Sequence, residues 1–450
     1  MKKNLLLTIL LSVLGLGSFA QNWEWTKVAG GPAVDKLTGI AQDHSGNIFV
    51  TGYFDSTIAF DSIHLVSAGG TDVFIAKYDP DGVLLWAKQV GGQNDDYSSA
   101  ISTDITGNCY VTGFFFVQGT FTTFGTTTIT QAGDADMFVS KFTAAGNLLW
   151  VRNGGGKSED AAFGISTDVS GNSYVTGYFS GTALFGTTKV TSMGYSDIFI
   201  AKYDAAGNLV WVRSGGGSYQ DEAYAVGTDF AGNCYITGYF TGNSIFSGVP
   251  LSSAGYFDTD VLLLKYNPSG LLVWAKRAGG TANDIGYGLN ITTGGQAMVC
   301  GVYQGTRSFG ETILNRIGGS NGFIARFETS GKMTWVRGTS GDNFSEFRKV
   351  STDGAGNSYV AGSITGDVKF ENTAISSMGD KDACIAKYDN KGTLMYVLQG
   401  GGTDDDECMS ISTDGTGNCY VGGQFNTSAT FGKMKFAGWM QQDVFISRIK

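Results

Sequence analysis

One short pattern recurs seven times along the 450-residue chain, and it constrains the fold more than any other feature of the sequence. The pattern is close to Asp-x-x-Gly-Asn-x-Tyr-Val-Thr-Gly, and successive copies are 61, 64, 61, 63, 61 and 61 residues apart. The copies start at Asp43, Asp104, Asp168, Asp229, Thr292, Asp353 and Asp414. Self-similarity at a fixed period indicates one supersecondary unit that is repeated in space. The chain is therefore expected to fold as an array of similar units.

A second column of residues repeats with the same spacing. It lies in a Leu-x-Trp-x-Lys/Arg motif, and its members are Trp25, Trp86, Trp150, Trp211, Trp274, Trp335 and Tyr396. The steps of the two columns agree, so the count of seven repeats does not depend on one motif. The first tryptophan precedes every complete repeat, whereas the last repeat ends before its own copy of this motif.

Each repeat has the pattern of four short strands, as the third repeat illustrates. Segments 161–167, 173–179, 197–202 and 209–213 are rich in β-branched, aromatic and small residues. Asp168 and Gly171 predict a tight turn between the first two, because aspartate can accept backbone hydrogen bonds and glycine tolerates a positive φ. The 68 glycines against 4 prolines agree with a chain of many turns and links.

Four-stranded repeats of this size are typical of propeller blades, and seven lies within the usual range of blade numbers. The sequence therefore predicts an all-β fold, a seven-bladed β-propeller of four-stranded blades that occupies residues 21–450 as a single domain. We expect the N-terminal strand, residues 23–27, to close the last blade, because that repeat lacks its tryptophan strand. Closure would also cover a sheet edge that is otherwise open.

The repeat resembles a known family. The stretch from Asp168 to Gly177, followed by segments 197–204 and 209–213, is similar to the bacterial SBBP-type β-propeller repeat. The resemblance extends over essentially all of residues 22–450, and the fifth repeat departs most, at residues 292–296. It implies a secreted or surface-associated protein and no settled activity or catalytic residues.

The first twenty residues have the layout of a secretory signal peptide. Lys2 and Lys3 precede an apolar run at residues 5–16, and Ala20 ends a small-residue cleavage site. We expect cleavage before Gln21 and an exported protein that is periplasmic, at the cell surface or secreted, with no integral membrane segment afterwards. The formal net charge of −10 argues against nucleic acid as a partner.

Two further columns predict how the units are held together. The lysine and arginine column of the third strand includes Lys77, Lys141, Lys202, Lys265 and Lys387, for which we expect ion pairs within or between blades. The tryptophan column is expected to pack between blades rather than to bind sugar. The six cysteines do not form a disulfide pattern, so we expect buried free thiols.

Aspartates begin the first and third strands of nearly every repeat. The first-strand positions are Asp35, Asp96, Asp160, Asp221, Asp284, Ser345 and Asp406, and the third-strand positions are Asp72, Asp136, Asp197, Asp260, Asn321, Asp382 and Asp443. In one interpretation they form an acidic rim that binds cations or a basic ligand. In the other, each carboxylate accepts backbone N–H groups of the Gly-rich links. No cofactor or metal site is predicted beyond a loosely bound cation at this rim.

Symmetry breaks at a few positions, which are the candidate binding residues. Lys349 occupies a column that other repeats fill with Gly, Ala or Ser, so it either pairs with the acidic residues or touches a ligand. The loops at the acidic end also carry Tyr195, Tyr256, Phe257 and Trp439, which no other repeat matches. Aromatic rings beside carboxylates suit carbohydrate or protein binding.

Signals for catalysis are few, and the catalytic residues are unknown. Outside the leader the chain has two histidines, His44 and His64, without metal-ligand spacing, and no common nucleophile motif. The leading hypothesis is an exported, non-catalytic, monomeric propeller that binds carbohydrate or protein through its acidic loop face. The alternatives are a polysaccharide-acting hydrolase or lyase on the same scaffold, and a purely structural component of the cell envelope.

Overall fold

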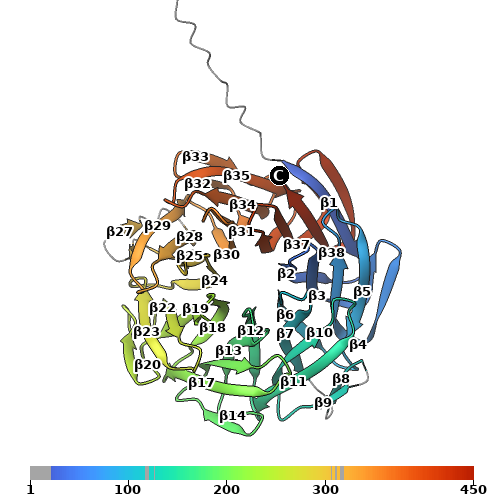
Figure 1. Ribbon diagram of the computed structural model, residues 1–450. Coiled ribbons are helices and arrows are strands. Elements are labelled where there is room, and N and C mark those ends of the chain that lie inside the picture. Colours follow the sequence, from blue (N-terminus) through green and yellow to red (C-terminus); the bar gives the residue numbers. More distant parts are fainter. Residues whose placement is uncertain (1–21, 117–120, 126, 306, 310–311, 315–318) are drawn as a thin grey trace, which may run out of the picture.

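The computed structural model describes residues 22–450, except 117–120, 126, 306, 310–311 and 315–318. Within these ranges the chain forms strands and turns, and none of it is an α-helix, so the described residues include no helix that could cross a membrane. Figure 1 shows antiparallel sheets arranged in a ring around an open centre, with the first and last strands side by side. The expected signal peptide, residues 1–20, lies outside the described residues.

The longer strands of the described residues fall into four sets at increasing distance from the centre (Figure 1). The inner strands are β2 (Asp35–Gln42), β6 (Asp96–Thr103), β12 (Asp160–Thr167), β18 (Glu222–Thr228), β24 (Ile285–Ile291), β30 (Ser345–Thr352) and β36 (Glu407–Thr413). The second strands are β3 (Ile48–Phe60), β7 (Cys109–Phe116), β13 (Ser173–Phe179), β19 (Cys234–Thr241), β25 (Ala297–Tyr303), β31 (Ser358–Ile364) and β37 (Cys419–Phe431).

The remaining sets lie farther from the centre. The third strands are β4 (Ile63–Tyr78), β10 (Ala135–Phe142), β16 (Asp197–Tyr203), β22 (Thr259–Tyr266), β28 (Asn321–Phe327), β34 (Asp382–Tyr388) and β38 (Met434–Ile449). The fourth strands are β1 (Trp23–Gly30), β5 (Leu84–Val90), β11 (Leu148–Gly156), β17 (Leu209–Gly217), β23 (Leu272–Ala278), β29 (Met333–Ser340) and β35 (Leu394–Gly401).

Five short hairpins complete the described strands. They are β8 (Phe121–Phe124) with β9 (Thr127–Thr130), β14 (Thr182–Phe185) with β15 (Thr188–Thr191), β20 (Asn243–Phe246) with β21 (Val249–Ser252), β26 (Arg307–Phe309) with β27 (Thr312–Leu314), and β32 (Asp367–Phe370) with β33 (Thr373–Ser376). Several of them continue the outer edge of the preceding sheet, as where β14 pairs with β11 and β20 with β17. These pairings cover edges that would otherwise expose unpaired backbone groups.

Pairing within each repeat runs outwards in sequence order. In the third repeat, β12, β13, β16 and β17 are antiparallel neighbours, and Lys202 pairs with Tyr174 on one side and Trp211 on the other. Each inner strand also contacts the inner strand of the next repeat, and β36 contacts β2, so the ring is closed. The inner strands therefore line a central channel.

The N-terminal strand belongs to the sheet of the C-terminal strands. β1 pairs antiparallel with β38, with Trp25 opposite Arg448, and the buried Trp23 packs on Phe431 with ring centroids 4.9 Å apart. Asn22 and Lys450 exchange backbone hydrogen bonds of 2.8 and 3.0 Å. This is the closure that the sequence predicts, and it joins the two ends of the described chain.

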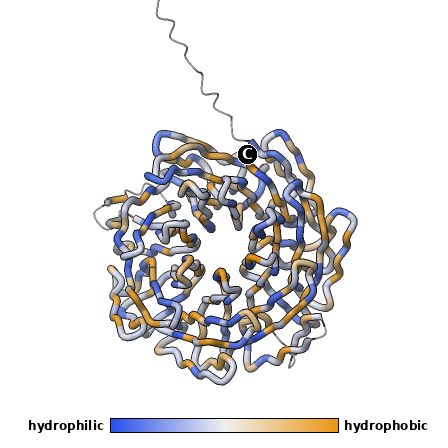
Figure 2. Tube along the Cα trace, viewed as in Figure 1, coloured by the Kyte–Doolittle hydropathy of each residue, from blue (hydrophilic) through white to orange (hydrophobic). Residues whose placement is uncertain are grey.

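The hydrophobic core lies between neighbouring sheets rather than inside one of them. One buried cluster, for example, combines Tyr110 and Met137 of the second repeat with Val175 and Phe199 of the third. Figure 2 shows hydrophobic and hydrophilic stretches alternating around the whole ring. All six cysteines are buried and free, which confirms the expectation from their spacing. Each repeat therefore depends on its neighbours for burial.

Two of the repeated columns connect neighbouring strands and repeats. The lysine column forms ion pairs with the turn aspartates, at 3.3 Å for Lys77–Asp43 and for Lys141–Asp104. The indole N–H of Trp150 donates to the Ala205 carbonyl at 3.1 Å, and Trp86, Trp211, Trp274 and Trp335 make the same bond to the turn of the following repeat. The tryptophan column thus packs between repeats, as predicted.

Candidate functional site

The candidate residues gather at one end of the ring. The Gly-rich links that lead from a fourth strand to the next inner strand lie there, together with the loops that lead into the third strands. We call this the link end. The Asp-x-x-Gly-Asn turns lie at the opposite end, because they follow the inner strands.

The first-strand aspartates lie at the link end but are not exposed. Asp35, Asp96, Asp160, Asp221, Asp284 and Asp406 have no exposed surface. Five of them accept a hydrogen bond from a backbone N–H of their Gly-rich link, at 2.6 to 2.8 Å, from Gly92, Gly156, Gly217, Gly280 and Gly402. Of the two interpretations left open by the sequence, these bonds match the structural one. Binding of a surface ligand by these carboxylates stays a prediction.

Burial changes the acidity of these carboxyl groups. It raises the pKa of Asp35 to about 8 and that of Asp96 to about 7, and a nearby third-strand aspartate adds to the effect in both cases. The pKa values of Asp160, Asp221 and Asp406 are raised to about 7 for the same reasons. Desolvation disfavours the ionised form, and a second carboxylate disfavours it further. Some of these carboxyl groups can therefore remain protonated near neutral pH.

Three of the four predicted aromatic residues are largely exposed, and two of them, Tyr256 and Phe257, are in contact. Tyr195, Tyr256 and Phe257 are 73%, 66% and 70% exposed. Tyr219, which sequence analysis did not single out, lies edge-on to both Phe257 and Tyr256, with ring centroids 5.5 and 6.1 Å apart. The ring centroids of Tyr256 and Phe257 are 4.8 Å apart. A side-chain hydrogen bond with Tyr256 raises the pKa of Tyr219, and Tyr195 lies near enough to add to this shift. We call these four residues the aromatic cluster.

Trp439 is placed elsewhere. It is exposed and lies in β38, and its backbone N–H donates to Asp443 Oδ2 at 2.6 Å. Among the described residues no ring contact joins it to the aromatic cluster. Trp439 therefore lies outside the aromatic cluster.

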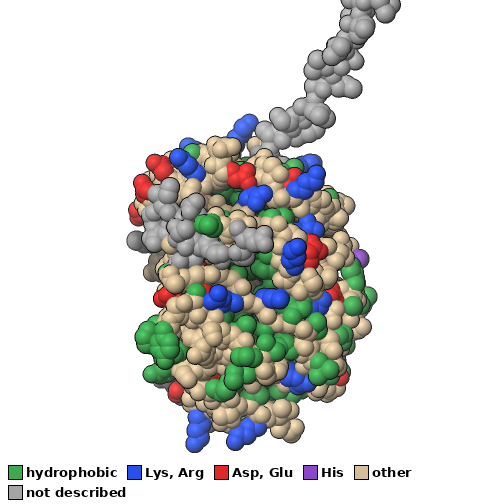
Figure 3. All heavy atoms as spheres, turned by 90° about the vertical axis from the view of Figure 1, so that its left-hand side faces the viewer, with side chains coloured by type: hydrophobic (Ala, Val, Ile, Leu, Met, Phe, Trp, Pro, Cys, Tyr) green, Lys and Arg blue, Asp and Glu red, His purple; other side chains and the backbone are tan. Residues whose placement is uncertain are grey.

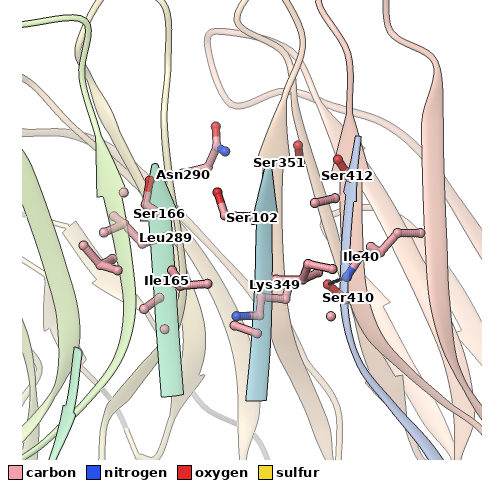
Figure 4. A pocket seen from close by; sticks show the side chains of 18 of the residues that line it. Ile40, Ser102, Ile165, Ser166, Leu289, Asn290, Lys349, Ser351, Ser410 and Ser412 are labelled. Carbon is pink, nitrogen blue, oxygen red and sulfur yellow. Dashed lines mark hydrogen bonds between the residues drawn. The ribbon is translucent and has the colours of Figure 1, made fainter. Parts of the chain in front are cut away.

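Lys349 lies in the central channel, on the inner strand β30. Figure 4 shows its side chain extending into a cavity of about 260 Å³ that Ser102, Ser166, Asn290 and Ser410 also line. The pairing of Lys349 with an aspartate, one of the two alternatives from the sequence, is not found among the described residues. Burial lowers the pKa of Lys349. The other repeats have small residues at the position of Lys349 because the inner strands converge here.

An arc of aromatic rings surrounds the channel at the link end. Starting from Tyr53, each ring contacts the next with centroids 4.9 to 6.4 Å apart, and the members are Tyr53, Tyr97, Phe114, Phe163, Tyr224 and Tyr287. Arg348 lies over the Tyr287 ring at 4.6 Å and ends this aromatic arc. The arc, Arg348 and Lys349 line a mouth cavity of about 480 Å³.

Sequence reasoning missed the aromatic arc, although a signal for it was present. Phe163, Tyr224, Tyr287 and Arg348 all lie three residues after the first-strand aspartate or its equivalent, where other repeats have Thr, Ser or Met. The large residues thus occur in consecutive repeats, three to six. Only the ring geometry shows that these residues face one opening.

Side chains that could ligate a metal do not gather in the described part of the chain. Within it no group of three or more His, Cys, Asp or Glu side chains is arranged to hold a metal ion. Figure 3 shows a side wall on which charged side chains are scattered among hydrophobic ones. The loosely bound cation suggested by the sequence stays a prediction. The link end has aromatic rings around and beside a channel, and this arrangement can bind a ligand.

A closed ring of radially arranged antiparallel sheets around a channel is a β-propeller, and its inter-repeat core is that of a repeat protein. The chain carries the SBBP β-propeller repeat: the family described as "Beta-propeller repeat" matches residues 85–113. This stretch includes the Trp86 strand and the second Asp-x-x-Gly-Asn turn.

Two curated relatives are similar over most of this chain. The uncharacterized WD repeat-containing protein L264 of Acanthamoeba polyphaga mimivirus is 23% identical over 440 residues, which cover 78% of this chain and 32% of the relative. The regulatory protein FlaEY of Caulobacter vibrioides is 24% identical over 353 residues, which cover 72% of this chain and 35% of the relative. The chain thus spans about a third of the length of these relatives.

Solved structures with a similar course of the chain include the WD40 domain of Neurospora crassa Pan2. It is 10% identical and has a TM-score of 0.45, with 95% of this chain and 97% of the Pan2 chain covered. A chain of a mitotic checkpoint complex is 8% identical, with a TM-score of 0.46 and 98% of both chains covered.

Proposed function

We propose that the protein is an exported, non-catalytic β-propeller that binds a partner protein at its link end. In this proposal residues 1–20 are removed, and residues 21–450 form a single domain of seven four-stranded blades. The single observation that carries it is the aromatic cluster, three of whose rings are largely exposed.

The geometry of the cluster supports binding to a protein. Tyr219, Tyr256 and Phe257 contact one another edge to face, so they form a preordered projection that loses little side-chain freedom on binding. Aromatic residues of this kind dominate the energetic centres of protein interfaces. Exposed apolar side chains that lie together, rather than singly, mark interaction sites.

A carbohydrate is the second candidate ligand, and the exposure of single rings favours it. Tyr195 and Tyr256 are both mostly exposed, and each has a hydroxyl group at the edge of the ring. Such a ring can stack on a pyranose face while its hydroxyl forms a hydrogen bond. The predicted enzymatic alternative would need a group that reacts at the channel, for which Lys349 is the candidate; loss of turnover in Lys349→Ala would support it.

The test compares a variant of the aromatic cluster with a control variant at the opposite end of the ring. The purified mature protein is used to capture partners from the envelope and culture fractions of its own source, and is screened on a glycan array in parallel. We expect Tyr256→Ala with Phe257→Ala to abolish binding. Phe230→Ala is the matched control, because Phe230 is 71% exposed but lies in an Asp-x-x-Gly-Asn turn at the opposite end.

Each outcome of the test supports or contradicts one of the proposed roles. Loss of a captured protein in the cluster variant alone supports the protein partner, and loss of glycan binding supports the carbohydrate. Binding that survives in the cluster variant, or that is lost equally in Phe230→Ala, contradicts the assignment to the cluster. The absence of any captured protein or bound glycan contradicts the binding function and favours a structural role.

A further inference from the structure

Lys349 has no counter-ion among the described residues, and it lies at the junction of two cavities. It lines both the channel cavity and the mouth cavity. Among the described residues that line the channel cavity, it is the only one with a charged side chain. No hydrogen bond or ion pair of its amino group is found within the described part of the chain. Burial lowers the pKa of Lys349 because it disfavours the charged form of the amino group.

The neighbouring charge, in contrast, is compensated. Arg348 Nη2 donates to Glu346 Oε2 at 2.9 Å, and its guanidinium lies over Tyr287. Glu346 also accepts a hydrogen bond from Ser363. The Nε atom of Arg348 is nevertheless buried without a hydrogen-bond partner. Among the described residues, the mouth cavity is thus bounded by one ammonium group without an ion pair, that of Lys349, which attracts a negatively charged ligand.

The shape and lining of the mouth specify the rest of such a ligand. The aromatic arc supplies ring edges and faces, while the channel side offers hydroxyl groups such as those of Thr38 and Ser98. A mouth of about 480 Å³ is the size of a small-molecule site, and such sites combine apolar walls with a few polar groups that fix orientation. An inorganic anion would leave the aromatic arc unused.

We propose that the mouth of the channel binds a small organic carboxylate with an aromatic body, its carboxylate against the amino group of Lys349 and its ring against the aromatic arc. This site is separate from the aromatic cluster, so it does not depend on the partner protein proposed above. The carboxylate restores the counter-ion that Lys349 lacks.

The experiment uses 3-phenylpropionate as the probe and its neutral amide, 3-phenylpropanamide, as the comparison. Both are titrated into the purified wild-type protein and followed by ligand-observed NMR. A charge-assisted hydrogen bond distinguishes the two, so we expect the carboxylate to bind at least ~10-fold more tightly than the amide. This comparison needs no variant and therefore does not depend on how a substitution folds.

Variants locate the site. Lys349→Met should weaken carboxylate binding to the level of the amide, whereas Lys349→Arg should retain most of it. Lys332→Met is the matched control, because Lys332 is exposed in a turn at the opposite end. Tyr256→Ala should also bind the probe normally, which separates this site from the aromatic cluster. Equal affinity for the acid and the amide, unchanged binding in Lys349→Met, or no binding at about 10 mM probe overturns the proposal.

Discussion

The carboxylates of Asp72 and Asp96 meet across a glycine. A Cβ atom on Gly91 would lie 2.1 Å from Asp72 Oδ1 and 2.8 Å from Asp96 Oδ2, so only glycine fits between them. The same arrangement recurs at Gly155, Gly216, Gly279 and Gly401, each between a third-strand aspartate and the first-strand aspartate of the next repeat. At the junction of the fifth and sixth repeats, Asn321 and Ser345 stand in place of the two acids.

These pairs predict a fold that is more stable in mild acid than in mild alkali. Burial raises the pKa values of Asp72 and Asp136 to about 6, those of Asp96 and Asp160 to about 7 and that of Asp35 to about 8, against about 3.9 in the unfolded chain. The folded state thus binds more protons than the unfolded state from about pH 4 to pH 8, so stability falls as the pH rises through this window. We expect the melting temperature to be several degrees higher at pH 5.5 than at pH 8.5 in differential scanning fluorimetry; an equal or higher value at pH 8.5 contradicts this account.

Removing one acid of a pair should remove part of that pH dependence. Asp72→Asn reproduces the neutral residue that the chain itself has at position 321. Its amide can still accept the bond from Gln89 Nε2, which reaches Asp72 Oδ2 at 3.0 Å. We expect the melting temperature of this variant to exceed that of the wild type at pH 8.5 and to differ less between the two pH values. Asp81→Asn, in an exposed turn, is the control.

Closure by β1 should contribute a large share of the stability. Trp23 is buried against Phe431 and Phe445, so Trp23→Ala is expected to lower the free energy of unfolding by ~3–5 kcal/mol. Deleting residues 21–28 should lower the melting temperature more, because it also exposes the edge of β38. Denaturant unfolding measures both effects. Trp439→Ala, which removes an exposed ring, should change little, and a deletion variant that melts like the wild type argues against closure by β1.

Two glycines with the same backbone conformation should respond differently to alanine. Gly207 and Gly186 both have positive φ, of 82° and 57°. A Cβ on Gly207 would lie 2.6 Å from Trp150 Cδ2, whereas nothing lies within 4 Å of a Cβ on Gly186. Gly186→Ala should cost only the backbone strain, ~1 kcal/mol, and Gly207→Ala distinctly more because the indole must move. Denaturant unfolding measures the free energy of unfolding of both variants. An equal loss in the two would show that the contact with the indole does not matter.

Export should remove the leader at a defined position. Expressed from the full-length gene in a bacterium with a secretion pathway, the protein is expected to begin at Gln21, because Ser18 and Ala20 are small residues at a cleavage site. Mass spectrometry of the intact protein measures this. Ala20→Arg should block cleavage and leave the longer chain. Wild-type protein that keeps residues 1–20 and stays in the cytoplasm contradicts the signal peptide and the proposed export.

Much of the architecture could be predicted because it is local and repeated. The Asp168–Gly171 turn, the strand pattern after it and the position of Trp150 all follow from residues that lie within one period. The pairing of β1 with β38 followed from a missing strand at one end and an extra strand at the other. Inferences of this kind need only the order of the strands along the chain and the rule that proteins cover the exposed edges of their sheets.

The candidate site was less predictable, for a geometric reason. Tyr195, Tyr256 and Phe257 were recognised because they break the symmetry of the repeats, but Tyr219 joins them from a different loop. Trp439 breaks the symmetry equally and lies apart. Whether two such loops touch depends on how far neighbouring sheets are rotated around the axis, which no single repeat records.

The sequence by itself therefore determined the repeating unit, its turns and the closure of the chain, since these depend on short-range spacing. Only the tertiary structure decided that the repeated aspartates are buried in pairs, that Phe163, Tyr224 and Tyr287 form part of one arc, and that Lys349 has no counter-ion within the part of the chain that the structure describes. The physical reason is that burial and charge compensation arise between repeats and across the channel. They depend on the distances that the closed ring imposes on residues far apart in the chain.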